Sequence, residues 1–291
     1  MSEFFFVSNP SKICLFYSYL GLRHLRHLDL SHNDLASVWL SDHVFGHLGH
    51  LRHLNLSTNR ITELDATLFN ALHGLTTLDL NNNAITRIEE DAFYNQTELE
   101  TLLLSSNGLT GIAHGSFRGL ASLKVLDLSS NKISFIHEQA FESLSRLEVL
   151  DLRNNDLNLI PVSLKYLPSL SILNLSSNVI SELSGDNFLL ESLNVLILSD
   201  NQIMRIRDNY FNYTLNLEEL NLANNRLNSI SPDLFNKLDK LTDLNLEHNE
   251  LTDINGLFTT HSTLLRLNVS YNKEFYVTRA RQNIFIFKVA R

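Results

Sequence analysis

Apolar and polar positions recur along this chain with a period of about 24 residues. Each period holds two aliphatic residues separated by one variable residue, and an asparagine three residues after the second aliphatic. The aliphatic-x-aliphatic segment predicts a short strand whose aliphatic side chains point inward, because side chains alternate along a strand. A period of this length is typical of a stack of like supersecondary units, so the pattern predicts a solenoid.

The asparagines are the most regular element of the pattern. Their spacings are 26, then 24 four times, then 23, 23, 24, 24 and 23. A buried turn leaves backbone donors and acceptors without partners, and an asparagine amide supplies both kinds of group. We therefore expect an inward ladder that bonds the turn backbone of its own and adjacent coils. Its members are Asn33, Asn59, Asn83, Asn107, Asn131, Asn155, Asn178, Asn201, Asn225, Asn249 and Asn272.

A second ladder, of aromatic residues, follows about ten residues after the asparagines. It consists of Phe45, Phe69, Phe93, Phe117, Phe141, Phe188, Phe211, Phe235 and Phe258, and Leu164 replaces phenylalanine in the sixth coil. Stacked rings would fill the wider side of each coil and leave thin strands on the other side. The expected fold class is α/β: a horseshoe-shaped solenoid with a concave parallel β-sheet and an irregular or short-helical convex side.

The frame L-x-x-L-x-L-x-x-N-x-L is that of the leucine-rich repeat. Repeats such as 123–131 and 147–155, with a convex phenylalanine, resemble the "typical" 24-residue class. That class occurs in Toll-like receptors and in chaoptin- and connectin-like adhesion proteins, so the resemblance implies a cell-surface context. It does not choose among receptors, adhesion molecules and secreted binding proteins. Plant receptors carry Gly-x-Ile-Pro after the asparagine, whereas this chain has only Leu159–Pro161, which disfavours that branch.

Eleven repeats fill residues 22–272, and shorter segments flank them at 1–21 and 273–291. Asn9 lies 24 residues before Asn33, and Phe4 and Phe6 fall at the aliphatic positions of a strand. The first segment is therefore interpreted as a degraded leading repeat, with a processing remnant as the alternative. It lacks the unbroken apolar core of a signal peptide.

Cysteine usage bears on how the solenoid ends. Cys14 is the only cysteine, so no intramolecular disulfide can form, and residues 273–291 show no recognisable cap. Extracellular members of the superfamily generally carry cysteine-clustered caps. We therefore expect an incomplete ectodomain of a longer protein, with exposed core leucines in the terminal coils and self-association through these uncapped ends. The sequence contains no run of eighteen apolar residues, so no membrane-spanning helix is expected.

The residue before each aliphatic pair and the residue between the pair point to the concave face. Several of these positions in successive repeats are apolar, and over four strands they would form a lane of roughly 15 Å. Such a strip is typical of a partner-binding patch. The alternative is that valine and isoleucine are there as good strand formers. The patch consists of Leu103, Val125, Val149, Ile172, Val195 and Ile197, bordered by Asp127 and Asp151.

Five N-x-S/T triplets are candidate glycosylation sites, at Asn55, Asn95, Asn174, Asn212 and Asn268. Asn95 and Asn212 follow a convex phenylalanine, where a glycan would meet no obstruction. The other three lie on the concave strands. A glycan on Asn174 would project into the apolar patch and exclude the partner-binding hypothesis.

Histidines concentrate at the start of the repeats, with seven of the twelve between residues 24 and 53. His27 and His53 occupy equivalent positions in adjacent coils, as do His24 and His50. Three interpretations stay open: duplication of one coil whose histidines have no function, a contact that gains charge below about pH 6.5, and a divalent metal site. No acidic residue completes a ligand set, so no metal is expected. Trp39, in a two-residue insertion, either folds back onto its coil or anchors a partner.

The net charge of −9 and the pI of about 5.7 argue against nucleic acid as a partner. The sequence contains no Gly-rich phosphate loop, nucleophile motif or H-E-x-x-H, so neither catalysis nor a cofactor is expected. We predict a non-enzymatic protein-recognition module that presents its concave face to a protein ligand or co-receptor at the cell surface or outside the cell. The alternatives are an intracellular (cytoplasmic) scaffold and a non-catalytic regulatory subunit.

Overall fold

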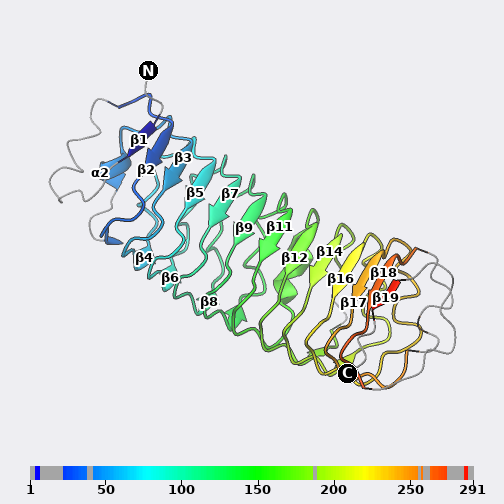
Figure 1. Cartoon of the computed structure of the whole chain (residues 1–291). Helices are drawn as coiled ribbons and strands as arrows, with labels where there is room; N and C mark the ends of the chain where they lie inside the picture. Colours follow the sequence, from blue (N-terminus) through cyan, green and yellow to red (C-terminus); the bar gives the residue numbers. More distant parts are fainter. Residues whose placement is uncertain are drawn as a thin grey trace. The chain divides into compact units, whose positions relative to one another are not determined.

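The computed structural model describes residues 4–6, 22–37, 42–185, 189–254, 257, 263–273 and 285–287. The chain divides into two compact units, Met1–Leu150 and Asp151–Arg291. In each unit, successive coils lie side by side and each contributes one strand to a parallel sheet (Figure 1). The expectations for Asn9, Cys14, Trp39, Phe188 and Phe258 fall outside the described residues.

The sheet of the first unit follows chain order, and each strand pairs in parallel with the next. Its strands are β1 (Phe4–Phe6), β2 (His27–Asp29), β3 (His53–Asn55), β5 (Thr77–Asp79), β7 (Thr101–Leu103) and β9 (Val125–Asp127). Strand β11 (Val149–Asp151) lies where the two units meet in the sequence. From β2 onward, the central leucine of one strand sits opposite the central leucine of the next, as Leu28 does with Leu54.

The second unit repeats this arrangement, again with parallel neighbours in chain order. Its strands are β12 (Ile172–Asn174), β14 (Val195–Ile197), β16 (Glu219–Asn221), β17 (Asp243–Asn245), β18 (Arg266–Asn268) and β19 (Phe285–Phe287). The central leucines of β12 to β18 are at most 2% exposed. Full burial of one leucine side chain contributes about 1.5–3 kcal/mol, so this ladder is a main stabilising element of the fold.

The ladder asparagines bridge adjacent coils through their side-chain amides. Nδ2 of Asn201 donates to the Leu198 and Ser199 carbonyls of its own coil and to the Leu175 carbonyl of the preceding coil, at 3.0–3.2 Å. Its Oδ1 accepts the N–H of Ile180, 3.0 Å away in the preceding coil. Similar bonds recur from Asn59 to Asn272. The asparagine amide thus satisfies both carbonyl and N–H groups of the buried turns, as the sequence predicts.

The phenylalanine ladder fills the other side of the coils. Phe45, Phe69, Phe93, Phe117, Phe141, Phe211 and Phe235 are fully buried. Neighbouring rings stack with centroids 6.0 Å apart for Phe69 and Phe93 and 6.1 Å apart for Phe117 and Phe141. Leu164, which replaces phenylalanine, is also buried, at 2% exposed.

Between the strand and the aromatic side, the chain forms small two-stranded parallel sheets that the repeat pattern did not predict. They are β4 (Glu63–Leu64) with β6 (Arg87–Ile88), β8 (Gly111–Ile112) with β10 (Phe135–Ile136), and β13 (Glu182–Leu183) with β15 (Arg205–Ile206). The helices given with both ends are α2 (Asp42–Phe45) and the 3-10 helix η2 (Val162–Tyr166), and Ser37 also has 3-10 conformation. The expected irregular or short-helical side is therefore confirmed.

The ends of the repeat array differ from the expectation. The core leucines of the first full coil, Leu25 and Leu28, are 4% and 2% exposed, and Leu264 and Leu267 of the last are 3% and 1% exposed. The predicted exposure of these leucines is therefore wrong. The reason is that β1 pairs with β2 in the first unit and β19 pairs with β18 in the second, so each sheet continues past its last full repeat.

The pairing of β1 also corrects a register. Phe5, and not Phe4, lies opposite the central Leu28 of β2, while Phe4 lies opposite His27. The offset is one residue shorter than the spacing of Asn9 and Asn33 suggested. The expected alignment of Phe4 with Leu28 is therefore wrong by one residue.

Candidate functional site

Outward side chains form two lanes on the sheet face of each unit, the face that the sequence analysis expected to be concave. The first lane consists of the first residue of each strand and the second lane of the last residue. The central leucine points inward, so its two neighbours point outward. In the three-residue strands from β2 to β18, all these outward residues are half-buried or exposed. Adjacent positions in a lane lie about 4.8 Å apart.

In the first unit, the structure brings Leu103, Val125 and Asp127 onto adjacent strands. Leu103 in β7 is opposite Asp127 in β9, and Val125 is opposite Thr101. Val149 is the first residue of β11. All four side chains of the predicted patch in this unit are half-buried. The first unit therefore offers a small apolar area next to a carboxylate.

In the second unit, Ile172, Val195 and Ile197 form a contiguous apolar cluster. Ile172 in β12 is opposite Val195 in β14, and Ile197 is opposite Asn174. Ile172 is 37% exposed, and Val195 and Ile197 are half-buried. Asp151, also half-buried, accepts the backbone N–H of Arg153 at 2.9 Å. This cluster is the most apolar part of the sheet face in the second unit, and we call it the isoleucine–valine cluster.

The second lane has a structural role that the sequence analysis missed. Oδ1 of Asp127 accepts the N–H of Ser129 at 2.9 Å, and Asp29, Asn174 and Asn245 make the equivalent bond two residues ahead. Such a bond caps the turn that leaves the strand. The signal was present in the sequence, because nine of the eleven positions between the paired aliphatic residues are Asp or Asn. Asp127 and Asp151 are therefore turn-forming residues first, and the second carboxylate oxygen of Asp151 also pairs with Nε of Arg153, 3.4 Å away.

One coil that lacks this cap obtains an acceptor from its neighbour. Leu103 has no side-chain acceptor, and the N–H of Ser105 instead bonds Oδ1 of Asn81 at 2.7 Å. Asp79 is itself half-buried, and burial raises the pKa of its carboxyl group; the N–H of Asn81 opposes this shift, and Asp29 and Asp127 add to it. The second lane of the first unit is thus acidic and closely spaced.

The histidines of the first two coils stack in pairs. The ring centroids of His27 and His53 are 4.3 Å apart with planes 7° from parallel, and those of His24 and His50 are 5.8 Å apart at 17°. Ring nitrogens have their lone pairs in the ring plane, so face-to-face rings do not direct two lone pairs at one ion. No group of three or more metal-binding side chains occurs in the described part of the chain. This geometry disfavours the metal interpretation.

The sheet face of β16 to β18 carries a shallow polar hollow. It is lined by Glu219, Asp243 and Arg266 in the first lane and by Asn221, Asn245 and Asn268 in the second. Arg266 forms an ion pair with Asp243, and Nδ2 of Asn268 donates to Glu247 at 3.0 Å. The hollow therefore offers polar contacts where the isoleucine–valine cluster offers apolar ones.

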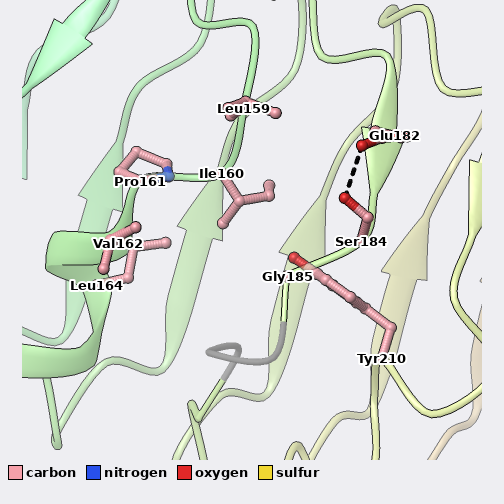
Figure 2. A pocket seen from close by; sticks show the side chains of 9 residues that line it. All are labelled: Leu159, Ile160, Pro161, Val162, Leu164, Glu182, Ser184, Gly185 and Tyr210. Atoms are coloured by element: carbon pink, nitrogen blue, oxygen red, sulfur yellow. Dashed lines mark hydrogen bonds between the residues drawn. The ribbon is translucent and has the colours of Figure 1, made fainter.

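A pocket of about 180 Å³ lies beside η2 in the second unit. Figure 2 shows its lining residues, Leu159, Ile160, Pro161, Val162, Leu164, Glu182, Ser184, Gly185 and Tyr210. Ser184 Oγ donates to Glu182 at 2.7 Å, and burial raises the pKa of the Tyr210 phenol above its usual range. Glu182 is the one basic group among these lining residues, and no histidine, lysine or second carboxylate accompanies it. It also adjoins residues 186–188, which lie outside the described ranges.

The family model for the leucine rich repeat matches residues 18–61, 49–109, 97–157 and 191–251, more than half of the chain. The chain belongs to the leucine-rich-repeat family. This family is one of protein-interaction scaffolds, which agrees with a site made of outward strand residues and not of catalytic groups.

Solved structures of other leucine-rich-repeat proteins share the fold. A Leptospira interrogans leucine-rich-repeat protein is 28% identical with a TM-score of 0.75, over 89% of this chain and 69% of that one. Toll of Drosophila, in complex with Spätzle, is 25% identical with a TM-score of 0.80, over 92% and 38%. Toll-like receptor 13, in complex with a single-stranded RNA, is 27% identical with a TM-score of 0.66, over 92% and 45%. This leucine-rich-repeat chain thus spans less than half the length of either receptor chain.

A search of the curated proteins found no match to this leucine-rich-repeat chain. Within the described ranges, every helix is too short or too polar to cross a membrane.

The five candidate glycosylation sites fall into two structural classes. Asn55, Asn174 and Asn268 lie in the second lane, where each Oδ1 accepts a turn N–H. On the aromatic side, Asn95 is half-buried, with Nδ2 3.1 Å from Asn70 Oδ1, and the Thr97 that completes its triplet is exposed.

Asn212 differs from Asn95 in the residue that completes its triplet. Thr214 is fully buried, and its hydroxyl donates to the Phe211 carbonyl at 3.0 Å. Modification of Asn212 therefore requires access before this coil folds, whereas Asn95 keeps an exposed threonine in the folded chain.

Proposed function

We propose that this leucine-rich-repeat chain is a non-enzymatic recognition module whose sheet face binds a protein ligand or co-receptor. The observation that carries the proposal is the isoleucine–valine cluster, three apolar side chains held on paired strands and partly open to solvent. Strand residues are already ordered before binding, so association costs little conformational entropy. The half-buried Leu103, Val125 and Val149 are a separate apolar group on the sheet face of the first unit.

The proposed setting is the cell surface or the extracellular space, as part of a receptor or adhesion protein. Two observations support this setting. The chain is similar to Toll, whose structure was solved with Spätzle as a protein ligand. Asn95 also offers a glycosylation triplet with an exposed threonine. The intracellular scaffold and the regulatory subunit stay as alternatives. Glycan occupancy in the native protein would exclude the scaffold, and co-purification with a catalytic chain would favour the regulatory subunit.

A protein partner is preferred over RNA, although the similar Toll-like receptor 13 was solved with RNA. A surface that follows a phosphate backbone needs many closely spaced cations. The net charge of this chain is −9, and the sheet face carries Asp29, Asp79 and Asp127 in the second lane of the first unit. These charges would repel a polyanion and leave the apolar cluster as the main source of affinity.

The test compares two single substitutions in a secreted preparation of the whole chain. A panel of purified extracellular proteins is screened for binding to the wild type. The affinity of each protein that binds is then measured for the wild type, Ile172→Asp and Tyr213→Asp. Ile172 is 37% exposed on the sheet face, and Tyr213 is 54% exposed beside the aromatic ladder, so neither change disrupts the core. We expect Ile172→Asp to weaken binding at least tenfold, because a carboxylate would be desolvated at the contact.

The matched control, Tyr213→Asp, should bind like the wild type, and both variants should unfold at the wild-type temperature. A partner lost with Tyr213→Asp but retained with Ile172→Asp would contradict the sheet-face assignment. A glycan found on Asn174 would contradict it as well, because Asn174 lies beside Ile172 and opposite Ile197.

A further inference from the structure

The first two full coils display a basic face that the proposed protein-binding cluster does not use. The outward residues that lead into β2 and β3 are arginines and histidines, and no carboxylate occurs in 22–28 or 49–54. Six of the seven are exposed and His27 is half-buried. They are Arg23, His24, Arg26 and His27 in the first coil and His50, Arg52 and His53 in the second. We call these seven residues the basic face.

The basic face is a continuous surface, because its residues occupy equivalent positions in adjacent coils. His27 is opposite His53 in the sheet, and the two histidine pairs stack. Arg52 extends the face toward the third coil, where Nη1 donates to the Gly74 carbonyl at 2.8 Å. Arg52 also forms an ion pair with Glu98. Arg23 and Arg26 are exposed, and no described residue forms an ion pair with either of them.

We infer that the basic face binds a short acidic segment of a protein partner and binds it more tightly at pH 5.5 than at pH 7.5. Arg23 and Arg26 attract carboxylates at both pH values, whereas Arg52 already pairs with Glu98. Imidazole side chains gain positive charge in mildly acidic solution, so acid adds positive charge to the surface that carries these histidines. Bound carboxylates would relieve the repulsion between stacked imidazolium rings.

The outward positions of β2 and β3 hold one carboxylate, whereas Arg52 and the stacked partner ring oppose a further positive charge on His53. Asp29 is the outward carboxylate on β2, and one of its oxygens accepts the N–H of Ser31. The position opposite His53 on β5 is the neutral Thr77, and the position opposite His27 on β1 is Phe4. Burial lowers the pKa of His53, and His27 and Arg52 lower it further. His53 therefore gains its charge at a lower pH than an unperturbed imidazole does.

The extent of the basic face favours an acidic peptide segment over a polyanion. The corresponding positions of the next two coils hold no arginine or lysine: His73, Gly74, Thr76 and Thr77 in the third coil are followed by Thr97, Glu98, Glu100 and Thr101 in the fourth. An extended segment of four residues spans about 13 Å, which is enough to cross two coils. A nucleic acid or sulfated polysaccharide would need cations along many coils, and it would meet the carboxylates of the fourth.

The test measures binding of a fluorescein-labelled glutamate octapeptide by anisotropy at pH 7.5 and 5.5, at low salt. We expect the octapeptide to bind about tenfold more tightly at pH 5.5 than at pH 7.5. A variant with His24, His27, His50 and His53 all changed to Asn should lose the pH effect and keep the weak binding. The matched control, His114→Asn with His137→Asn, removes another neighbouring histidine pair, with centroids 5.5 Å apart, and should keep the effect.

Loss of the pH effect in the control as well, or its retention in the fourfold variant, would overturn the inference. So would a labelled RNA or heparin fragment that tightens at pH 5.5 while the octapeptide does not. Should the fourfold variant fail to fold, His24→Asn with His50→Asn changes only exposed residues and should still reduce the effect. The inference is independent of the proposed sheet-face contact, because Ile172→Asp should bind the octapeptide like the wild type.

Discussion

Interior positions of the coils repeat one residue type, whereas first-lane positions on the sheet face change from coil to coil. The ladder position is asparagine in every repeat, but the first lane runs through His, Thr, Val, Ile, Glu, Asp and Arg. The difference has a physical cause. Each buried turn presents the same backbone groups, which an asparagine satisfies, while a solvent-facing position imposes no such requirement. Partner choice is therefore free to vary in the first lane without loss of the fold.

The second lane lies between these two extremes. It faces outward, but Asp or Asn occupies nine of its eleven positions because the side chain caps the following turn. Exposure alone therefore does not show that a residue is available for a partner. The residues most free to define a ligand are those of the first lane, together with Leu103 and Ile197, the two apolar members of the second.

The largest expected effect comes from the aromatic ladder. Phe117→Ala should lower the free energy of unfolding by about 3–5 kcal/mol, because the ring is fully buried and stacks on Phe141. Phe117→Leu should cost about 1 kcal/mol, since Leu164 occupies the same position in another coil. Urea denaturation followed by circular dichroism measures both. Equal losses for the two variants would show that the ladder needs the aromatic ring itself and not its volume.

A smaller but sharper contrast separates inward and outward asparagines. Asn201→Ala should cost about 2–4 kcal/mol, because it leaves the buried Ile180 N–H and several turn carbonyls without partners. Asn221→Ala removes only the cap on the Ala223 N–H at a half-buried position and should cost about 0.5–1 kcal/mol. The same denaturation experiment applies. Similar losses for the two would erase the distinction between interior and sheet face.

The smallest predicted effect is the dependence of stability on pH at the stacked histidines. The pKa of His53 is lowered in the folded chain by burial, His27 and Arg52. The neutral form is therefore favoured by folding, so its stabilising contribution is present above about pH 6.5 and is lost as the pH falls through the folded pKa. His53→Asn should reduce the decrease in melting temperature between pH 7.5 and 5.0. An unchanged or larger decrease in the variant would show that His53 does not contribute to it.

The sequence determined most of the fold because the interior requirements repeat. Within the described ranges, the spacing alone predicts the correct faces for the central leucines, the ladder asparagines and the ladder phenylalanines. The turn caps of Asp127 and its equivalents were not predicted, because an outward polar residue was taken as solvent-facing without asking which N–H lay two residues ahead. The burial of Leu25 and Leu264 was also missed, since it depends on strands β1 and β19, which carry no leucine-rich frame.

The candidate site was less predictable than the fold. The spacing placed Ile172 and Val195 on adjacent strands, and the structure pairs them. No pattern in a single chain tells a binding residue from a good strand former, because both favour valine and isoleucine at half-buried positions. The stacking of His27 on His53 likewise followed from equivalent positions, but the face-to-face orientation that disfavours a metal required coordinates.

The most direct test of the central claim, that the sheet face is reserved for a protein partner, is glycopeptide mapping of the whole chain expressed through a secretory route. The account predicts a glycan on Asn95, and on Asn212 only if it is added before Thr214 is buried. It also predicts unmodified Asn174, beside Ile172 in the isoleucine–valine cluster. A glycan on Asn174 would contradict the claim, and no glycan at any of the five sites would favour the intracellular scaffold.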